Sequence, residues 1–147
     1  MIKYITIFFY LIFLNVSATE YLKFNSTDQK FPNHSEVLVE ISFPKKTAGK
    51  LPLIITQHGS TRDGKKIQDG ATDEYSKRII IEGTKQGFAV AAIDAFYKKP
   101  VEANEKTRFP DALNYANELR KILIKDERFD KEKFFYTGFS YGAQQVL

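Results

Sequence analysis

The most constraining feature of the sequence is a Gly-x-Ser-x-Gly motif that directly follows a short apolar run. Residues 134–137 read Phe-Phe-Tyr-Thr, and residues 138–142 read Gly-Phe-Ser-Tyr-Gly. The apolar run predicts a buried strand, and the small residues at the end of the motif suit the start of a helix. A strand–turn–helix of this kind lifts a serine hydroxyl above the end of a sheet, so Ser140 is the candidate nucleophile.

The two glycines of the motif have a predicted structural role. A turn this sharp brings the strand and helix backbones so close that a Cβ atom on either side would clash. We therefore expect Gly138 and Gly142 to be needed for the shape of the turn. An ordinary strand–turn–helix with an incidental serine is the alternative interpretation of the same residues.

Composition limits the class of protein. The chain has 147 residues, no cysteine, 43% apolar and 27% charged residues, which is typical of one globular domain. Its formal net charge is +4, but the lysines form isolated pairs, so nucleic acid is not an expected partner. Without cysteine there is no disulfide, thiolate nucleophile or thiolate zinc site. The spacing of Asp63, Asp69 and Asp73 does not match a calcium loop, so we expect no metal and no cofactor.

Residues 1–18 have the pattern of a secretory signal peptide. Lys3 precedes an uncharged apolar stretch at 5–14, and Val-Ser-Ala at 16–18 provides small residues for cleavage. The stretch is too short to cross a hydrocarbon core about 30 Å thick, so no stable membrane span is expected after cleavage. The predicted mature chain is 19–147, exported to the periplasm or outside the cell. A buried N-terminal helix is the alternative.

Hydrophobic periodicity predicts an α/β fold. Apolar runs and period-two patterns predict strands at 35–43, 51–56, 88–93 and from Phe134 onward. Helical spacing predicts two helices, one from Asp73 to Gly87 and one from Pro110 to Leu123 with Ile122 on its buried side. A charged turn is expected at 126–133. The alternation predicts a mainly parallel sheet with helices on both faces.

A second candidate feature follows the strand at 51–56, where the sequence reads Gln57-His58-Gly59-Ser60. In a fold with this turn, one oxyanion-hole N–H comes from the residue after the nucleophile and the other from this loop. The predicted donors are the N–H of Tyr141 and the N–H of Ser60 or Gly59. Losing one such donor costs about 3 kcal/mol of transition-state stabilisation.

Two ionisable residues near this edge of the sheet have less direct roles. His58 lies on the predicted oxyanion side of the serine, whereas a general base must approach from the other side. We therefore interpret His58 as a residue that braces the loop through the backbone. Asp94 follows a strand and either lines the site or caps its own loop.

The sequence resembles the α/β-hydrolase superfamily, in particular dienelactone hydrolase-like and prolyl-oligopeptidase-like esterases. The resemblance lies in residues 51–59, 87–94, 128–130 and 136–143. It implies a three-layer α/β-hydrolase fold with Ser140 as nucleophile. It also implies that Tyr141 supplies half of the oxyanion hole and that His58, Gly59 and Ser60 match the other half. Dienelactone hydrolases proper have cysteine at the nucleophile position, so serine here favours ester hydrolysis.

In that family the catalytic acid and histidine follow the nucleophile on later strands, and this sequence ends at Leu147. The expectation is an exported serine hydrolase for small-molecule ester or acyl substrates. The domain is expected to be incomplete after the turn, and the 147-residue chain is expected to be inactive as given. The alternative is a non-catalytic exported binding or interaction protein on a hydrolase scaffold.

Overall fold

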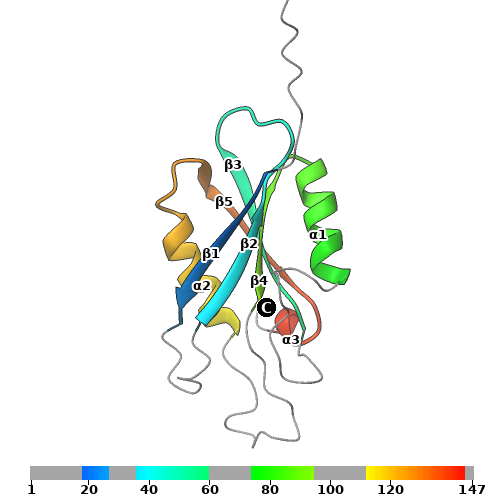
Figure 1. Ribbon diagram of the computed structural model, residues 1–147, viewed down its shortest axis with the longest axis vertical. Helices are drawn as coiled ribbons and strands as arrows, with labels where there is room; N and C mark the ends of the chain where they lie inside the picture. The colour runs from blue at the N-terminus through cyan, green and yellow to red at the C-terminus, as the bar shows by residue number, and fades with distance from the viewer. Residues whose placement is uncertain (1–17, 27–35, 60–73, 95–111, 145–147) are drawn as a thin grey trace, which may run out of the picture.

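The computed structural model describes residues 18–26, 36–59, 74–94 and 112–144, as drawn in colour in Figure 1. The elements in chain order are β1 (Thr19–Asn25), β2 (Glu36–Ser42), β3 (Leu51–Gln57), α1 (Glu74–Lys85), β4 (Ala89–Asp94), α2 (Ala112–Leu123), β5 (Phe129–Gly138) and α3 (Tyr141–Gln144). Residues 1–17 of the predicted signal peptide, the helix starts at Asp73 and Pro110, and Ser60 lie outside the described residues. No helix within the described ranges is long and apolar enough to cross a bilayer.

The strands form one sheet in the order β1-β2-β4-β3-β5. β3 is parallel to both β4 and β5, whereas β2 is antiparallel to both β4 and β1. The predicted α/β fold is confirmed, but the sheet is mixed, so the prediction of a mainly parallel sheet is wrong. For β1 and β2 the reason is that a parallel pair needs a crossover of about a dozen residues or more, whereas only residues 26–35 connect these two strands.

The sequence prediction missed β1 and placed the start of β5 too late in the chain. β1 has no strong periodic signal because it is an edge strand whose residues are mostly exposed. β5 begins at Phe129 rather than Phe134, because Phe129 pairs with Leu51 and is fully buried. The next paired residue is Phe134, opposite Leu53, so the charged residues 130–133 form an irregularity within the strand. The predicted charged turn at 126–133 is therefore wrong from Phe129 onward.

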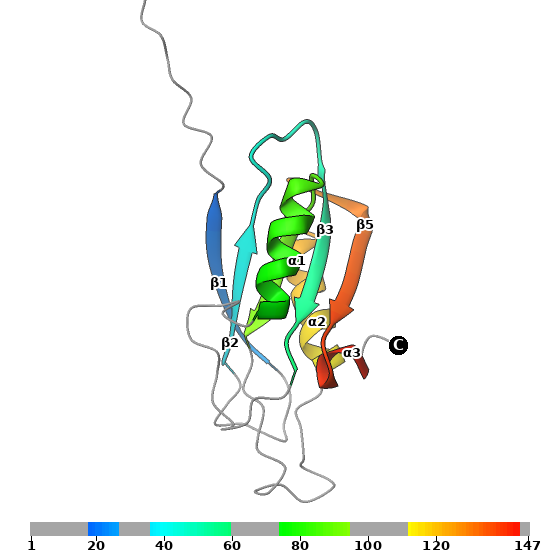
Figure 2. The ribbon, with the colours of Figure 1, turned by 90° about the vertical axis from the view of Figure 1, so that its right-hand side faces the viewer.

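The two longer helices cover opposite faces of the sheet (Figures 1 and 2). Ala89, Ala91 and Ile93 of β4 belong to the main core, which includes the buried side of α2. Val90 faces α1, and a Cβ atom at Gly83 of that helix would lie 2.7 Å from a Val90 methyl carbon. Alternate residues of β4 thus support different helices, as the pleat of a strand requires.

The buried side of α2 is formed by Tyr115, Ala116, Leu119 and Leu123. Ile122 is 37% exposed, so its predicted place on the buried side is wrong. The side chain of Tyr115 fills that side instead and is almost fully buried. This arrangement follows from helical spacing, because positions three and four residues apart share one face of a helix.

β5 lies at the edge of the described sheet, and one exposed part of it is apolar. Phe135 is 49% exposed and packs edge-on against Phe88. A groove of about 360 Å³ runs between α1 and β5, lined by Ile54, Ile79, Phe88, Phe135, Tyr136 and Thr137. This edge combines unpaired backbone groups with exposed apolar surface, which is a template for another strand.

Arg128 ties the first strand to the segment that leads into β5. Its guanidinium donates hydrogen bonds to Glu20 at 2.7 and 2.9 Å and to Asp126 at 2.8 Å. The same group lies 4.8 Å from the centre of the Phe43 ring, a cation–π contact. Hydrogen bonds from Arg128 hold the pKa values of Glu20 and Asp126 below their ordinary values. Arg128, Glu20 and Asp126 therefore link β1 to the start of β5 at one end of the sheet.

We expect Arg128→Met to destabilise the fold by about 1 kcal/mol at pH 7, because the ion pairs are partly exposed and contribute little in water. Both carboxyl pKa values are lowered by folding, so the stabilisation is present above the unfolded pKa values and is lost as pH falls through the folded ones. Urea unfolding of both proteins should show a difference at pH 7 that shrinks below about pH 4. An equal difference at both pH values would contradict the ion-pair explanation.

Candidate active site

The Gly-x-Ser-x-Gly motif forms a sharp turn at the carboxyl end of β5. The strand ends at Gly138 and α3 starts at Tyr141. The turn is closed by hydrogen bonds from Gly142 N–H to Phe139 O at 2.9 Å and from Ala143 N–H to Ser140 O at 3.1 Å. In Figure 2, α3 lies where the arrows of β3 and β5 end.

Ser140 occupies a strained backbone conformation. Its φ angle is 52°, and among the described residues no other non-glycine residue has a positive φ. The left-handed region costs a residue with a Cβ atom about 1–2 kcal/mol, so it persists only where the surroundings impose it. The side chain is exposed, as a nucleophile at the top of a sheet must be. Strain and exposure at one serine are the geometric signature of a nucleophile elbow.

The elbow glycines are packed against backbone. A Cβ atom at Gly138 would lie 2.5 Å from the carbonyl carbon and oxygen of Gly142. At Gly142 it would lie 2.7 Å from the carbonyl oxygen of His58 and 2.8 Å from that of Gln57. Side chains essentially never approach backbone so closely, so both positions accept only glycine at this geometry. α3 therefore packs directly on the end of β3.

The loop after β3 lies against Ser140. The Phe139 N–H donates to the Gln57 carbonyl oxygen at 3.1 Å. A Cβ atom at Gly59 would be 3.1 Å from the Ser140 Cβ and 3.2 Å from the Phe139 carbonyl oxygen. Gly59 and Ser140 are thus neighbours in space, 81 positions apart in sequence.

Of the predicted oxyanion-hole donors, Tyr141 and Gly59 lie within the described residues, and Ser60 does not. Tyr141 is the first residue of α3, and N–H groups in the first turn of a helix have no acceptor within that helix. Gly59 brings its backbone close to Ser140, whereas Ser60 lies outside the described residues. The placement of Gly59 and Tyr141 is consistent with an oxyanion hole, and their roles remain predictions.

His58 and Asp94 form a buried pair beside the elbow. Their side chains are 2% and 1% exposed, and Nε2 of His58 lies 3.9 Å from Oδ1 of Asp94. Nδ1 of His58 is within hydrogen-bonding distance of the Gly59 carbonyl oxygen. Both ring nitrogens therefore face the loop and the neighbouring strand, as a loop-bracing histidine would.

The sequence analysis did not predict that His58 pairs with Asp94. The register of the β3–β4 ladder explains why these two residues meet. Gln57 is paired with Ile93 in the parallel β3–β4 ladder, so the next residue of each strand follows side by side. His58 is the only histidine within the described residues, and no group of three metal-ligating side chains occurs there. A serine hydroxyl needs an adjacent base to attack an ester, and the role of Ser140 as nucleophile stays a prediction.

Solved hydrolase structures share this fold. An esterase from Pyrobaculum calidifontis matches 88% of the chain at 16% identity, with a TM-score of 0.59. An acylaminoacyl peptidase from Pyrococcus horikoshii matches 90% at 19% identity, with a TM-score of 0.60. A dienelactone hydrolase-like phosphotriesterase from metagenomic libraries matches 88% at 15% identity, with a TM-score of 0.56. The expected resemblance to these hydrolases is confirmed at the level of the fold.

The chain spans only part of these proteins. The matched region is 36% of the Pyrobaculum esterase, 21% of the Pyrococcus peptidase and 54% of the metagenomic phosphotriesterase. No family model matches the sequence, and no curated protein sequence is significantly similar to it. The α/β fold of this chain therefore resembles part of an α/β-hydrolase core.

Proposed function

We propose that this chain is the N-terminal part of an exported serine hydrolase that cleaves small-molecule esters or related acyl compounds. The observation that carries the proposal is the strained, exposed Ser140, held at a strand-to-helix turn beside Gly59. Nucleophile elbows need this combination, since the serine must stand clear of the sheet. The proposal of export rests on the predicted signal peptide at residues 1–18.

The proposed reaction is acyl transfer through a covalent intermediate. The Ser140 Oγ attacks the carbonyl carbon of the ester while its proton passes to a histidine base. The tetrahedral oxyanion accepts hydrogen bonds from the N–H of Tyr141 and from the N–H of Gly59 or Ser60. Collapse returns that proton to the leaving alcohol, and water then hydrolyses the acyl-serine. The base and its carboxylate partner are assigned to sequence outside this chain, as the resemblance implies.

The structural comparisons support the ester chemistry only indirectly. The similar structures include proteins described as esterases and as a phosphotriesterase. Carboxylic esters and phosphotriesters both present an electrophilic centre that an activated serine can attack. Because fold alone does not determine function, the proposal rests on the turn at Ser140 and takes only its substrate class from the comparison.

A fluorophosphonate probe tests whether Ser140 is activated. In protein expressed from its complete gene, we expect a phosphonyl adduct on the tryptic peptide that contains Ser140, detected by mass spectrometry. The adduct should be absent after heat denaturation and in Ser140→Ala, since labelling needs a serine beside a base. A folded protein that the probe never labels would refute the hydrolase and support the exported binding protein on a hydrolase scaffold.

A further inference from the structure

Tyr75 contacts the elbow from α1, a helix to which the sequence assigned no role in the site. It lies in the first turn of that helix, and its hydroxyl is 2.6 Å from Oγ1 of Thr137. Its ring centre is 5.5 Å from that of Phe139, with the planes tilted by 31°. The hydroxyl and the ring of one side chain thus engage two different residues of the turn.

These two residues flank Gly138, the tightest point of the elbow. Thr137 precedes this glycine, and Phe139 follows it and is bonded directly to Ser140. Thr137 and Phe135 are two residues apart in β5 and both line the groove beside α1, so both lie on the face that α1 covers. From the other side, β3 fixes the turn through Gln57 and Gly59. The elbow is therefore held from α1 and from β3.

We propose that Tyr75 is a positioning residue that keeps Ser140 in its left-handed conformation. A strained φ relaxes unless the surrounding structure imposes it. The hydrogen bond to Thr137 fixes the residue three positions before the serine, and ring packing fixes Phe139 immediately before the serine. The kinetic consequence rests on the proposed hydrolase function, whereas the conformational consequence does not.

The contacts of Tyr75 are separate from those that attach α1 to the sheet. The helix packs on β4 near its other end, where Gly83 meets Val90 and Ile54. Tyr75 is not among the residues of the main core. Removing its hydroxyl should therefore loosen the elbow and leave the sheet intact.

Amide hydrogen exchange measures the loosening without any need for catalysis. The informative amides are those of Phe139 and Gly142, which donate to Gln57 O and Phe139 O. In Tyr75→Phe, which keeps the ring, we expect both to exchange about tenfold faster, as the loss of one partly buried hydrogen bond predicts. The amide of Ala91, in the centre of the sheet, should not change and is the internal control.

Changes at Thr137 identify the hydrogen bond as the cause. Thr137→Val should reproduce the effect of Tyr75→Phe, and the double variant should exceed neither single change, because both remove the same bond. Thr137→Ser keeps a hydroxyl and should retain wild-type exchange. Unchanged exchange at Phe139 and Gly142, or an equal rise at Ala91, would overturn the proposal.

A kinetic experiment then addresses the consequence for the reaction. In protein from the complete gene, Tyr75→Phe should lower the acylation rate about tenfold with KM unchanged, and Thr137→Ser should not. Faster exchange at the elbow together with an unchanged acylation rate would overturn the positioning role. If Ser140→Ala retained hydrolysis, the hydrolase assignment would fail, while the exchange result would still decide how the turn is held.

Discussion

Replacing Ser140 with alanine is expected to lower kcat/KM for a short-chain nitrophenyl ester by at least about 10⁴-fold in protein from the complete gene. The substitution removes the Oγ that forms the acyl intermediate and leaves only the oxyanion donors and substrate binding. Those groups alone give a residual acceleration over water. Alanine should also fold normally, because the hydroxyl is exposed and only the strained φ remains to be accommodated.

The matched control for this variant is Ser42→Ala. Ser42 lies at the end of β2, and its hydroxyl contacts the Glu40 carboxylate at 3.4 Å. This position is at the end of the sheet that Arg128 closes, away from the elbow, so wild-type kinetics are expected. Steady-state hydrolysis and far-UV circular dichroism on both variants separate lost chemistry from lost folding. Hydrolysis by Ser140→Ala at more than a hundredth of the wild-type rate would refute the nucleophile.

Gly142→Ala is expected to destabilise the fold by about 3 kcal/mol, because the new methyl group overlaps backbone rather than a movable side chain. The carbonyl oxygens of His58 and Gln57 stand 2.7 and 2.8 Å from the added atom. Either β3 or the start of α3 must move, and both carry residues of the candidate site. A shift of about 1 Å at a reacting atom also costs about 100-fold in rate, so activity should fall with stability.

Gly49→Ala is the control for the glycine experiment. Gly49 has a φ of 76°, but no heavy atom lies within 4 Å of the Cβ that would be added. Only the cost of the left-handed backbone applies, about 1 kcal/mol, and the site should be unaffected. Urea unfolding of both variants gives the comparison. Equal losses at positions 142 and 49 would contradict the close packing of α3 on β3.

The sequence predicted the parts of the fold that depend on local pattern. Val37, Val39 and Ile41 fall on one buried face as their period-two spacing indicates, and β4 is buried throughout. The sequence did not predict which strands pair, because the antiparallel pairing of β2 with β4 joins segments that are far apart in the sequence. β1 was missed for a related reason, since its strand state depends on its neighbour rather than on burial.

The candidate site, like the fold, could be predicted from the sequence only in part. The proximity of Gly59 to Ser140 follows from two neighbouring parallel strands that end at one edge, which sequence order can suggest. The contact of Tyr75 with Phe139 depends on how α1 lies across the sheet. That angle is set by packing at Gly83 and Val90, which no local spacing encodes. Local chemistry was therefore predictable, and its support from a distant helix was not.

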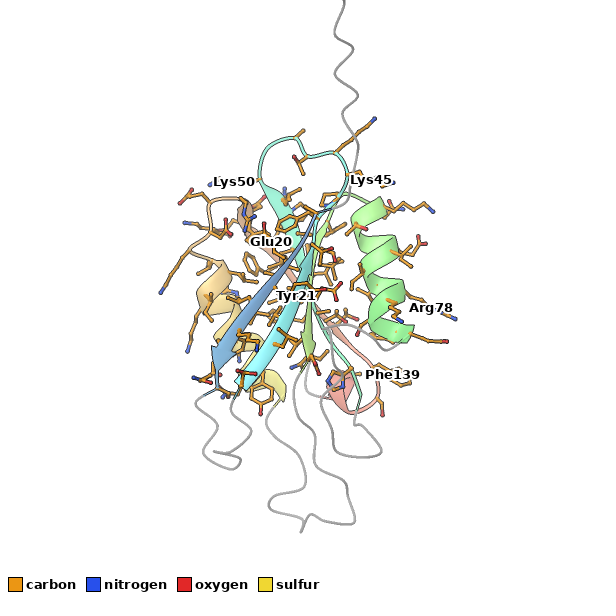
Figure 3. All side chains as sticks on the ribbon, viewed as in Figure 1. Glu20, Tyr21, Lys45, Lys50, Arg78 and Phe139 are labelled. Atoms are coloured by element: carbon orange, nitrogen blue, oxygen red, sulfur yellow. The ribbon has the colours of Figure 1, made fainter. Side chains whose placement is uncertain are left out.

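The position of β5 at the edge of the described sheet affects how Ser140 is supported. Figure 3 shows Phe139 at the opposite end of the sheet from Glu20, and β5 has β3 as its neighbour on one flank within the described sheet. Within the described sheet, the turn that carries Ser140 is thus attached through the pairing of β5 with β3, and α1 contacts it from one face. The stiffness of the backbone at Ser140 therefore depends on β3 and α1, and a strand that paired with the outer edge of β5 would stiffen the turn without touching Ser140.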